Sequence, residues 1–222
     1  MTDDLGSSAP LRLALFDLDG TLIAGDSLRR FVCLVARRAP RTLGQIPAIV
    51  RRLLGSRGRA GPMKEAILGV IDPLSAAEQR ALVAELIESL ARTCLRPEIV
   101  GLVARQEAAG RLPILISASP DLYVVPLAAR LGFRVVLATR LLRRDDGGCR
   151  SRIAGENLKG RAKLTALLQH LGTTPIDWSG SFACGDRYSD RVLLEQVGEA
   201  VAVHPDPRLR AQARVRGWRI VI

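Results

Sequence analysis

Short apolar runs alternate with helical patterns over most of this chain. The runs resemble those that form buried strands. They occupy residues 11–16, 113–116, 135–138, 182–184 and 200–203. Right-handed crossovers between parallel strands would bring the carboxyl ends of such strands to one edge of a sheet. The pattern therefore predicts an α/β fold with a doubly wound, mostly parallel, Rossmann-like sheet.

The alternation stops between residues 25 and 95, where apolar residues recur at helical spacing instead. A first helix is expected to end before Pro40 and a second at Gly55, and a third follows. Ser75 and Glu78 form a capping-box sequence that predicts the start of a fourth helix. We therefore expect a disordered tail at 1–10, a core at 11–24 and 96–222, and a helical cap at 25–95.

Turn and cap signals predict further elements in the second half of the chain. Pro97 suits the first turn of a helix that Gly110 would end. Ser119 is expected to cap the start of the next helix, and a later helix is expected over residues 158–171. The Asp-Asp-Gly-Gly sequence at 145–148 is typical of a turn, here of a short hairpin.

Charge and composition narrow the class of protein. The 222 residues carry a formal net charge of +11, and nine arginines but no acid lie between Ser27 and Met63. Such a block attracts polyanions or anionic lipid head groups, although a simply solvated basic face is an equally weighted alternative. The four cysteines lack Cys-x-x-Cys spacing, which favours a reducing compartment. Without an apolar signal sequence or a run of ~20 apolar residues, we expect a cytoplasmic protein, with peripheral contact at the inner membrane surface as an open alternative.

Two carboxylates follow the first apolar run, in the sequence Asp17-Leu18-Asp19-Gly20-Thr21. Alternation along the strand places Asp17 and Asp19 on the same side of the chain, and Gly20 lets the backbone turn away. Acids this close repel one another unless a cation or a proton intervenes, so they suggest either a hard-metal site or an acid and base pair. The alternative is a solvated Asp-Gly turn after a strand.

Polar residues also follow two later strands. Ser117 ends the run at 113–116, and Asp186 and Asp190 follow the run at 182–184. Lys159 and Lys163 lie at the start of the helix expected between them. Because strand ends of a parallel sheet share one edge, these side chains are expected to meet the first pair of acids.

These segments together resemble one known family. The sequence Phe-Asp-Leu-Asp-Gly-Thr-Leu at 16–22 resembles the first signature of the haloacid dehalogenase-like (HAD) phosphohydrolase superfamily. The sequences Ser-Ala-Ser-Pro at 117–120 and Gly-Asp-x-Tyr-Ser-Asp at 185–190 are similar to those of its phosphoserine-phosphatase-like subfamily IB. The helical segment at 25–95 lies where that subfamily carries its cap domain. The resemblance covers nearly the whole chain.

The resemblance implies roles for the acids. Asp17 would be the nucleophile that attacks phosphorus, and Asp19 the acid and base that serves the leaving oxygen and then water. Mg²⁺ would bind the carboxylates of Asp17 and Asp186 and the backbone carbonyl of Asp19. Asp190 would orient a metal-bound water or another ligand by hydrogen bonding, without binding the metal itself. An aspartate at position 19 is typical of phosphatases and phosphomutases and is lacking in the dehalogenases of the superfamily.

The resemblance also implies substrate contacts. Ser117 would donate a hydrogen bond to the phosphoryl group, and Lys163 would neutralise it, with Lys159 as the alternative lysine. Thr21 and Asp26 are the other expected substrate contacts. Asp26 stands at the position where phosphoserine phosphatases carry a glutamate that binds the substrate amine. The histidines, His170 and His204, lack metal-ligand spacing and are expected to be incidental.

These expectations favour a magnesium-dependent phosphatase that hydrolyses a phosphate monoester through an aspartyl phosphate. Three alternatives stay open. The basic helical segment resembles that of phosphatidylglycerophosphatase C-like members, which favours a lipid phosphate as substrate at a membrane surface. A phosphomutase or phosphotransferase would use the same intermediate. A basic polyanion-binding module with a vestigial site is the alternative that is not an enzyme. Nucleic acid is not an expected partner.

Overall fold

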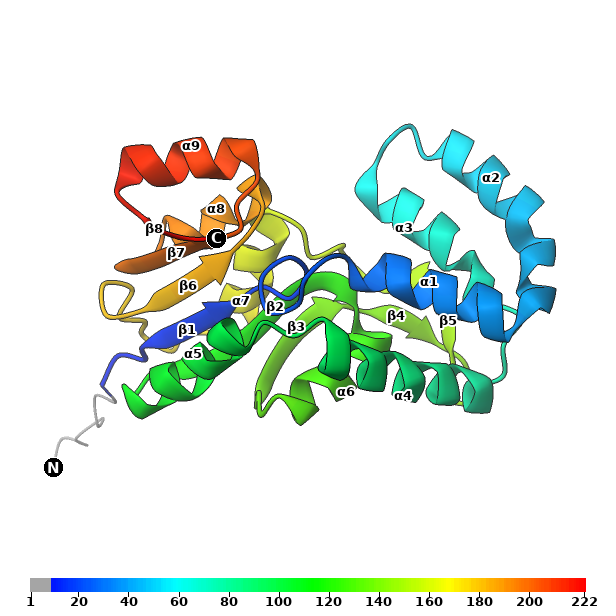
Figure 1. The fold of residues 1–222 in the computed structure, drawn as a ribbon, viewed down its shortest axis with the longest axis horizontal. Helices are drawn as coiled ribbons and strands as arrows, with labels where there is room; N and C mark the ends of the chain where they lie inside the picture. The colour runs from blue at the N-terminus through cyan, green and yellow to red at the C-terminus, as the bar shows by residue number, and fades with distance from the viewer. Residues whose placement is uncertain (1–8) are drawn as a thin grey trace, which may run out of the picture.

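A parallel sheet forms the centre of the molecule in this computed structural model, which describes residues 9–222. Its six strands follow the order β3-β2-β1-β6-β7-β8, and every neighbouring pair is parallel (Figure 1). The strands are β1 (Leu13–Phe16), β2 (Leu112–Pro120), β3 (Val135–Thr139), β6 (Phe182–Gly185), β7 (Glu199–Val203) and β8 (Arg219–Val221). This order confirms the predicted α/β fold, while residues 1–8 of the expected tail lie outside the described residues.

Helices cover both faces of this sheet because its strands are apolar on both sides. In β1, Ala14 and Phe16 belong to one buried cluster, and Leu13 and Leu15 belong to the other. Helices α5 (Pro97–Ala108) and α6 (Asp121–Arg130) contribute to the first cluster. Helices α7 (Arg161–Leu171), α8 (Arg191–Leu194) and α9 (Pro207–Arg216) contribute to the second. The sheet is therefore doubly wound.

The two central strands set the position of the site. β1 pairs with β2 on one side and with β6 on the other, so the chain winds outward in opposite directions from β1. Such a reversal leaves a crevice beyond the carboxyl ends of the central strands, which is where ligands bind in open α/β sheets. The motifs at 17–21 and 186–190 both follow these strands directly.

Four helices form the segment between β1 and α5. They are α1 (Ser27–Arg38), α2 (Ile46–Gly55), α3 (Ala60–Leu68) and α4 (Ala76–Thr93), with 3-10 turns η1 (Pro40–Gln45) and η2 (Gly69–Ile71) between them. The predicted capping box is present, since the Ser75 hydroxyl accepts from the Glu78 amide and the Glu78 carboxylate accepts from the Ser75 amide. Figure 1 shows α2 and α3 at the outer end of the molecule, beyond α1. We call residues 25–95 the cap.

A short antiparallel hairpin packs on the cap, although it follows β3 in the chain. It consists of β4 (Leu141–Arg143) and β5 (Cys149–Ile153), joined by the predicted turn. Gln79 of α4 exchanges hydrogen bonds with the backbone of Cys149. Asp72 accepts from the amide and hydroxyl of Ser151. These contacts attach the hairpin to the cap.

Two predicted boundaries were wrong. Ser119 does not cap a helix; β2 continues through it to Pro120, and α6 begins at Asp121. Helix α7 begins at Arg161 rather than at residue 158, because Gly160 has a φ of +62°. Helix α9 and strand β8, which the apolar pattern did not indicate, complete the sheet. No helix within residues 9–222 is long and apolar enough to cross a membrane.

Candidate active site

The predicted motifs meet in one pocket beyond the central strands. Asp17 follows β1, Ser117 lies near the end of β2, Asp186 follows β6, and Lys163 enters from the first turn of α7. The pocket has a volume of about 220 Å³. Its lining comprises Asp17, Asp19, Gly25, Asp26, Leu28, Ala60, Lys64, Ser117, Ala118, Ser119, Asn157, Lys159, Lys163, Asp186, Arg187, Ser189 and Asp190. Both the core and the cap therefore contribute side chains.

Gly20 allows the loop after β1 to pass close to β6. Its φ is +82°, in the left-handed region that favours glycine. A Cβ atom at this position would lie 2.0 Å from the Asp186 carboxylate. Any other residue would therefore displace Asp186, so the glycine of the motif allows two acidic loops to share one site.

An ion-pair cluster lies at the bottom of the pocket. Lys163 Nζ is 2.5 Å from the Asp17 carboxylate and 2.6 Å from the Asp190 carboxylate, and all three side chains are buried. Burial raises the pKa of Asp17 to about 8, opposed by the charge of Lys163. Burial also disfavours the charge on Lys163, but the two carboxylates outweigh it and raise the pKa of the lysine. Lys163, rather than Lys159, therefore supplies the buried cation beside Asp17.

Three of these acids have the arrangement of a metal site. Asp17, Asp186 and Asp190 each place one oxygen within 4.8 Å of the others. Asp186 Oδ1 is buried and has no hydrogen-bond partner among the described residues. Burial and the nearby Asp190 raise the pKa of Asp186 to about 7. A set of oxygen ligands with one bare oxygen fits a hard divalent cation such as Mg²⁺.

Asp19 points away from this cluster, toward the start of α1. Its carboxylate accepts a hydrogen bond from the Ser27 amide at 2.6 Å and another from the Ser119 hydroxyl. Burial raises its pKa, although these two hydrogen bonds oppose the shift. A carboxyl group with a raised pKa can carry a proton into a reaction and take one back. The hydroxyl of Ser119, which we expected to cap a helix, instead fixes this carboxylate.

The other predicted substrate residues differ in their surroundings. Ser117 is buried in the pocket lining, and its hydroxyl accepts from the Ser119 amide. Asp26 also lines the pocket and caps α1 by accepting from the Arg29 amide. Thr21 is buried, its hydroxyl has no partner within residues 9–222, and it is not among the lining residues. The structure therefore brings Ser117 and Asp26 to the pocket, but not Thr21.

Sequence reasoning missed a contact from the cap. Lys64 of α3 reaches into the pocket and donates to the backbone carbonyl of Ala118 and to Asn157 Oδ1. Burial lowers the pKa of Lys64 to about 8, opposed by the charge of Asp19. A signal existed for Asn157, which stands six residues before Lys163 and just before the expected helix. None existed for Lys64, because only the packing of the cap on the core brings it here.

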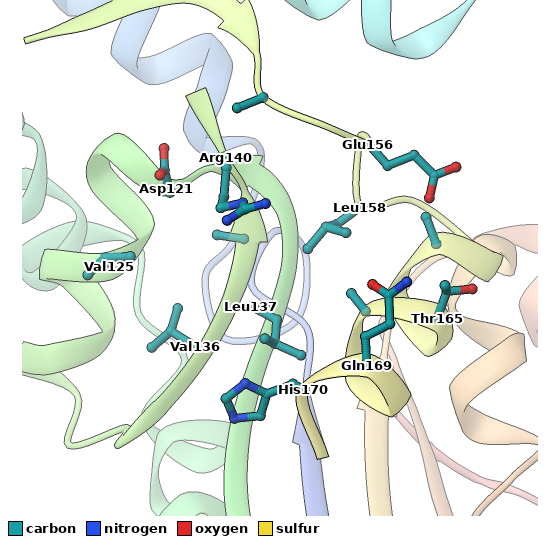
Figure 2. A pocket seen from close by; sticks show the side chains of 14 residues that line it. Asp121, Val125, Val136, Leu137, Arg140, Glu156, Leu158, Thr165, Gln169 and His170 are labelled. Atoms are coloured by element: carbon teal, nitrogen blue, oxygen red, sulfur yellow. The ribbon is translucent and has the colours of Figure 1, made fainter. Parts of the chain in front are cut away.

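A second and larger cavity, of about 470 Å³, lies beside edge strand β3 (Figure 2). Asp121 and Val125 of α6 border it on one side of the strand, and Gln169 and His170 of α7 border it on the other. Both carboxylate oxygens of Asp121 already have partners, since one pairs with Arg143 and the other accepts a hydrogen bond from the Leu141 amide. The lining lacks every predicted site residue, so chemistry is assigned to the smaller pocket.

Comparison with known proteins agrees with this geometry. The family model described as haloacid dehalogenase-like hydrolase matches residues 14–195. Phosphoserine phosphatase SerB1 of Mycobacterium tuberculosis is 34% identical over 216 residues, which cover 93% of this chain and 69% of that protein. Protein CicA of Caulobacter vibrioides is 31% identical over 198 residues, covering 87% of this chain and 86% of CicA.

Solved structures share the fold over nearly the whole chain. A protein of unknown function from Bordetella pertussis Tohama I has a TM-score of 0.82 and 29% identity, covering 96% of this chain and 99% of that one. A substrate-bound phosphoserine phosphatase has a TM-score of 0.67 at 18% identity, covering 96% and 94%. With the motifs gathered in one pocket, these matches confirm the resemblance seen in the sequence: the chain belongs to the haloacid dehalogenase-like hydrolase family and is a phosphatase of its phosphoserine-phosphatase-like group.

Proposed function

We propose that this chain is a magnesium-dependent phosphomonoesterase that forms an aspartyl phosphate on Asp17. One observation carries the proposal: Asp17 pairs with the buried cation Lys163 and shares a carboxylate cluster with Asp186, which keeps a bare buried oxygen. A buried acid with a pKa raised to about 8 is a poor nucleophile by itself. Cations are needed to hold it ionised, and the pocket provides one and has ligands for another.

In the first step, a carboxylate oxygen of Asp17 attacks the phosphorus of the bound ester, and the bond from phosphorus to the ester oxygen breaks. Asp19 gives its proton to the leaving oxygen, which departs as an alcohol. The raised pKa of Asp19 favours this protonated starting state. Ser27 and Ser119 hold the Asp19 carboxyl in one orientation through both steps.

In the second step, water attacks the phosphorus of the aspartyl phosphate. Asp19, now ionised, takes a proton from that water, and the bond from phosphorus to Asp17 breaks. Lys163 keeps its proton throughout, because two carboxylates raise its pKa, so it neutralises charge without taking part in proton transfer. Asp17, Asp186 and the backbone carbonyl of Asp19 would hold Mg²⁺, with Asp190 behind them or as a further ligand, and the ion would neutralise phosphoryl charge.

The pocket favours a small substrate that carries charge besides its phosphate. A volume of about 220 Å³ suits a small molecule. Lys64 has neutral oxygens as its hydrogen-bond partners, so its charge is available to an anionic group. Asp26, which lines the same pocket, can form an ion pair with an ammonium group of the substrate. A phosphorylated amino acid is therefore the substrate class we propose, in keeping with the name of the relative SerB1.

Phosphate release from a panel of phosphate esters tests the proposal. The panel comprises phosphoserine, sugar phosphates, nucleotides and p-nitrophenyl phosphate, each with Mg²⁺ and with a chelator. We expect turnover only with the metal, and highest kcat/KM for phosphoserine-like esters. Transfer of phosphate to an alcohol without release would instead identify a phosphotransferase. Phosphate binding without either product would identify a vestigial site.

Substitution at Asp17 tests the nucleophile. Asp17→Asn should lower kcat by ~10³-fold or more, because the amide cannot form the intermediate. Asp146→Asn, in the exposed hairpin turn, is the matched control and should keep wild-type activity. Asp19→Asn should still form the phosphoenzyme from p-nitrophenyl phosphate, whose leaving group needs little protonation, while alkyl esters slow by ~10²-fold or more. An Asp17→Asn enzyme with more than a few per cent of wild-type activity would refute the assignment.

A further inference from the structure

Helix α2 of the cap presents an apolar stripe to the outside. Leu43 of η1, just before α2, is 43% exposed, and Ile46, Val50 and Leu54 of α2 are 48%, 47% and 79% exposed. The last three are spaced four residues apart and so lie along one face of α2. No residue of α2 is fully buried. Figure 1 shows this helix at the outer end of the cap, far from the central sheet.

The other face of α2 packs against the cap, so the exposed stripe is not the face that anchors this helix. Ile49 packs against η2, where its side chain lies close to Gly69. Arg52 donates to the Ser151 hydroxyl and lies 3.9 Å from the Asp72 carboxylate. Contiguous exposed apolar residues with a polar rim typically mark an interaction surface. The stripe is therefore the part of α2 that the cap leaves without a partner.

The rim of the stripe is basic. Between Ser27 and Met63 there are nine arginines and no acid. Two of them pair with acids of α4, Arg38 with Glu85 and Arg41 with Glu78. Arg51, Arg57 and Arg59, on α2 and in the turn after it, are exposed and form no ion pair within residues 9–222. Their charges are exposed on α2 itself and within five residues of Leu54 in the chain.

We propose that the α2 stripe and its arginines form a docking surface for an anionic lipid bilayer. A short helix with an apolar face and a basic rim lies in a bilayer interface, where its apolar face enters the acyl boundary and its cations meet lipid phosphates. A second copy of the chain does not fit, because self-pairing would bring the outward-facing arginines of both copies together. The surface continues toward the active site, since Ala60, three residues after Arg57, lines the pocket.

This docking is independent of the chemistry proposed for Asp17. Asp17→Asn protein should bind vesicles as well as the wild type does, so failure of one proposal leaves the other intact. Docking would hold the pocket near the bilayer surface without requiring that the substrate be a lipid.

Sedimentation of the full chain with lipid vesicles tests the surface. The vesicles are phosphatidylglycerol mixed with phosphatidylcholine, compared with phosphatidylcholine alone, at low and at physiological salt. We expect binding to the anionic vesicles only, weakening as salt rises. Leu54→Ser and Arg51→Glu should each lower the partition coefficient by ~10-fold or more, since one loses inserted apolar area and the other reverses a charge near the surface.

Matched controls come from α9, on the core. Val215→Ser removes an apolar side chain that is 83% exposed, and Arg214→Glu makes the same change in net charge as Arg51→Glu. Both should bind vesicles within ~2-fold of the wild type, because only the α2 surface enters the bilayer. No sedimentation of the wild type with anionic vesicles at low salt would overturn the proposal. So would equal losses in the α2 and α9 variants, or a dimer in solution that Leu54→Ser dissociates.

Discussion

Two lysines reach the same pocket from different regions, and they differ in their partners and in the direction of their pKa shifts. Lys163, from the core, pairs with the carboxylates of Asp17 and Asp190, which raise its pKa. Lys64, from the cap, donates to the neutral oxygens of Ala118 and Asn157, and burial lowers its pKa to about 8. The first charge is neutralised by the protein itself. The second is left for a ligand to neutralise.

This contrast extends to the two regions as a whole. The core holds its acids close together at the ends of β1 and β6, where geometry is fixed by parallel strand pairing. The cap carries its cations on exposed helices, several of them without acidic partners among residues 9–222. Under the proposed function, the buried and paired groups would carry out the reaction, and the charges without acidic partners would select the substrate. Substitutions in the two regions should therefore change different kinetic constants.

The largest effect is expected from the core lysine. Lys163→Met should lower kcat by at least ~10²-fold, because it removes the buried cation that stabilises the ionised Asp17 and phosphoryl charge. It should also destabilise the metal-free protein by about 3 kcal/mol in urea unfolding at pH 8, because Asp17 and Asp190 lose their buried cation and Asp17 must then take up a proton to stay buried. That loss should shrink as pH falls toward the pKa of Asp17 in the unfolded chain, because protonating a buried acid then costs less free energy.

Lys159→Met is the control for this change, since Lys159 lines the same pocket and is exposed. Its activity and stability should stay close to those of the wild type. A larger loss of kcat in Lys159→Met than in Lys163→Met would exchange the roles of the two lysines.

A smaller effect is expected from the cap lysine. Lys64→Met should raise KM for a substrate with an additional anionic group by ~10-fold, which corresponds to about 1.4 kcal/mol of binding. The kcat should change little, because Lys64 is absent from the ion-pair cluster. For p-nitrophenyl phosphate, which lacks the additional group, neither constant should change. A fall in kcat comparable to that of Lys163→Met would remove the distinction between the two regions.

The smallest effect is a pH dependence of KM in the Mg²⁺-saturated enzyme. Because burial lowers the pKa of Lys64 to about 8, it loses its charge as pH rises through that value. The attraction for an anionic group is then lost, so KM should rise between pH 7 and pH 9.5. Lys64→Arg keeps its charge over this range, and its KM should stay flat. A parallel rise in both proteins would place the titration on another group.

Much of the site could be predicted from sequence because each motif is local. Asp17, Asp19 and Gly20 follow an apolar run directly, and the pleat and the turn fix their relation within a few residues. Parallel pairing then brings Asp186 to the same edge, as the alternation of strands and helices predicted. Lys163 was expected from the resemblance to the family, with Lys159 as the alternative, and the structure places Lys163 beside Asp17. The metal ion and the catalytic roles of these residues stay predictions.

Other features depended on contacts across the chain. The hydroxyl of Ser119 donates a hydrogen bond to Asp19 because β2 continues past Ser117. The local sequence, a serine before a proline, instead predicted a helix cap. Lys64 enters the pocket only because α3 packs over the core, since Lys64 and Asn157 are 93 positions apart in the chain. The hairpin at 141–153 joined the cap although it lies within the chain of the core.

The sequence by itself determined which carboxylates stand at which strand ends and where helices replace strands. Apolar periodicity and short motifs encode these features, since they depend on residues that are neighbours in the chain. The tertiary structure alone decided which charges are neutralised and which are free. That property depends on burial and on partners far apart in sequence, because a charge is stabilised by whatever lies within a few ångströms of it in space.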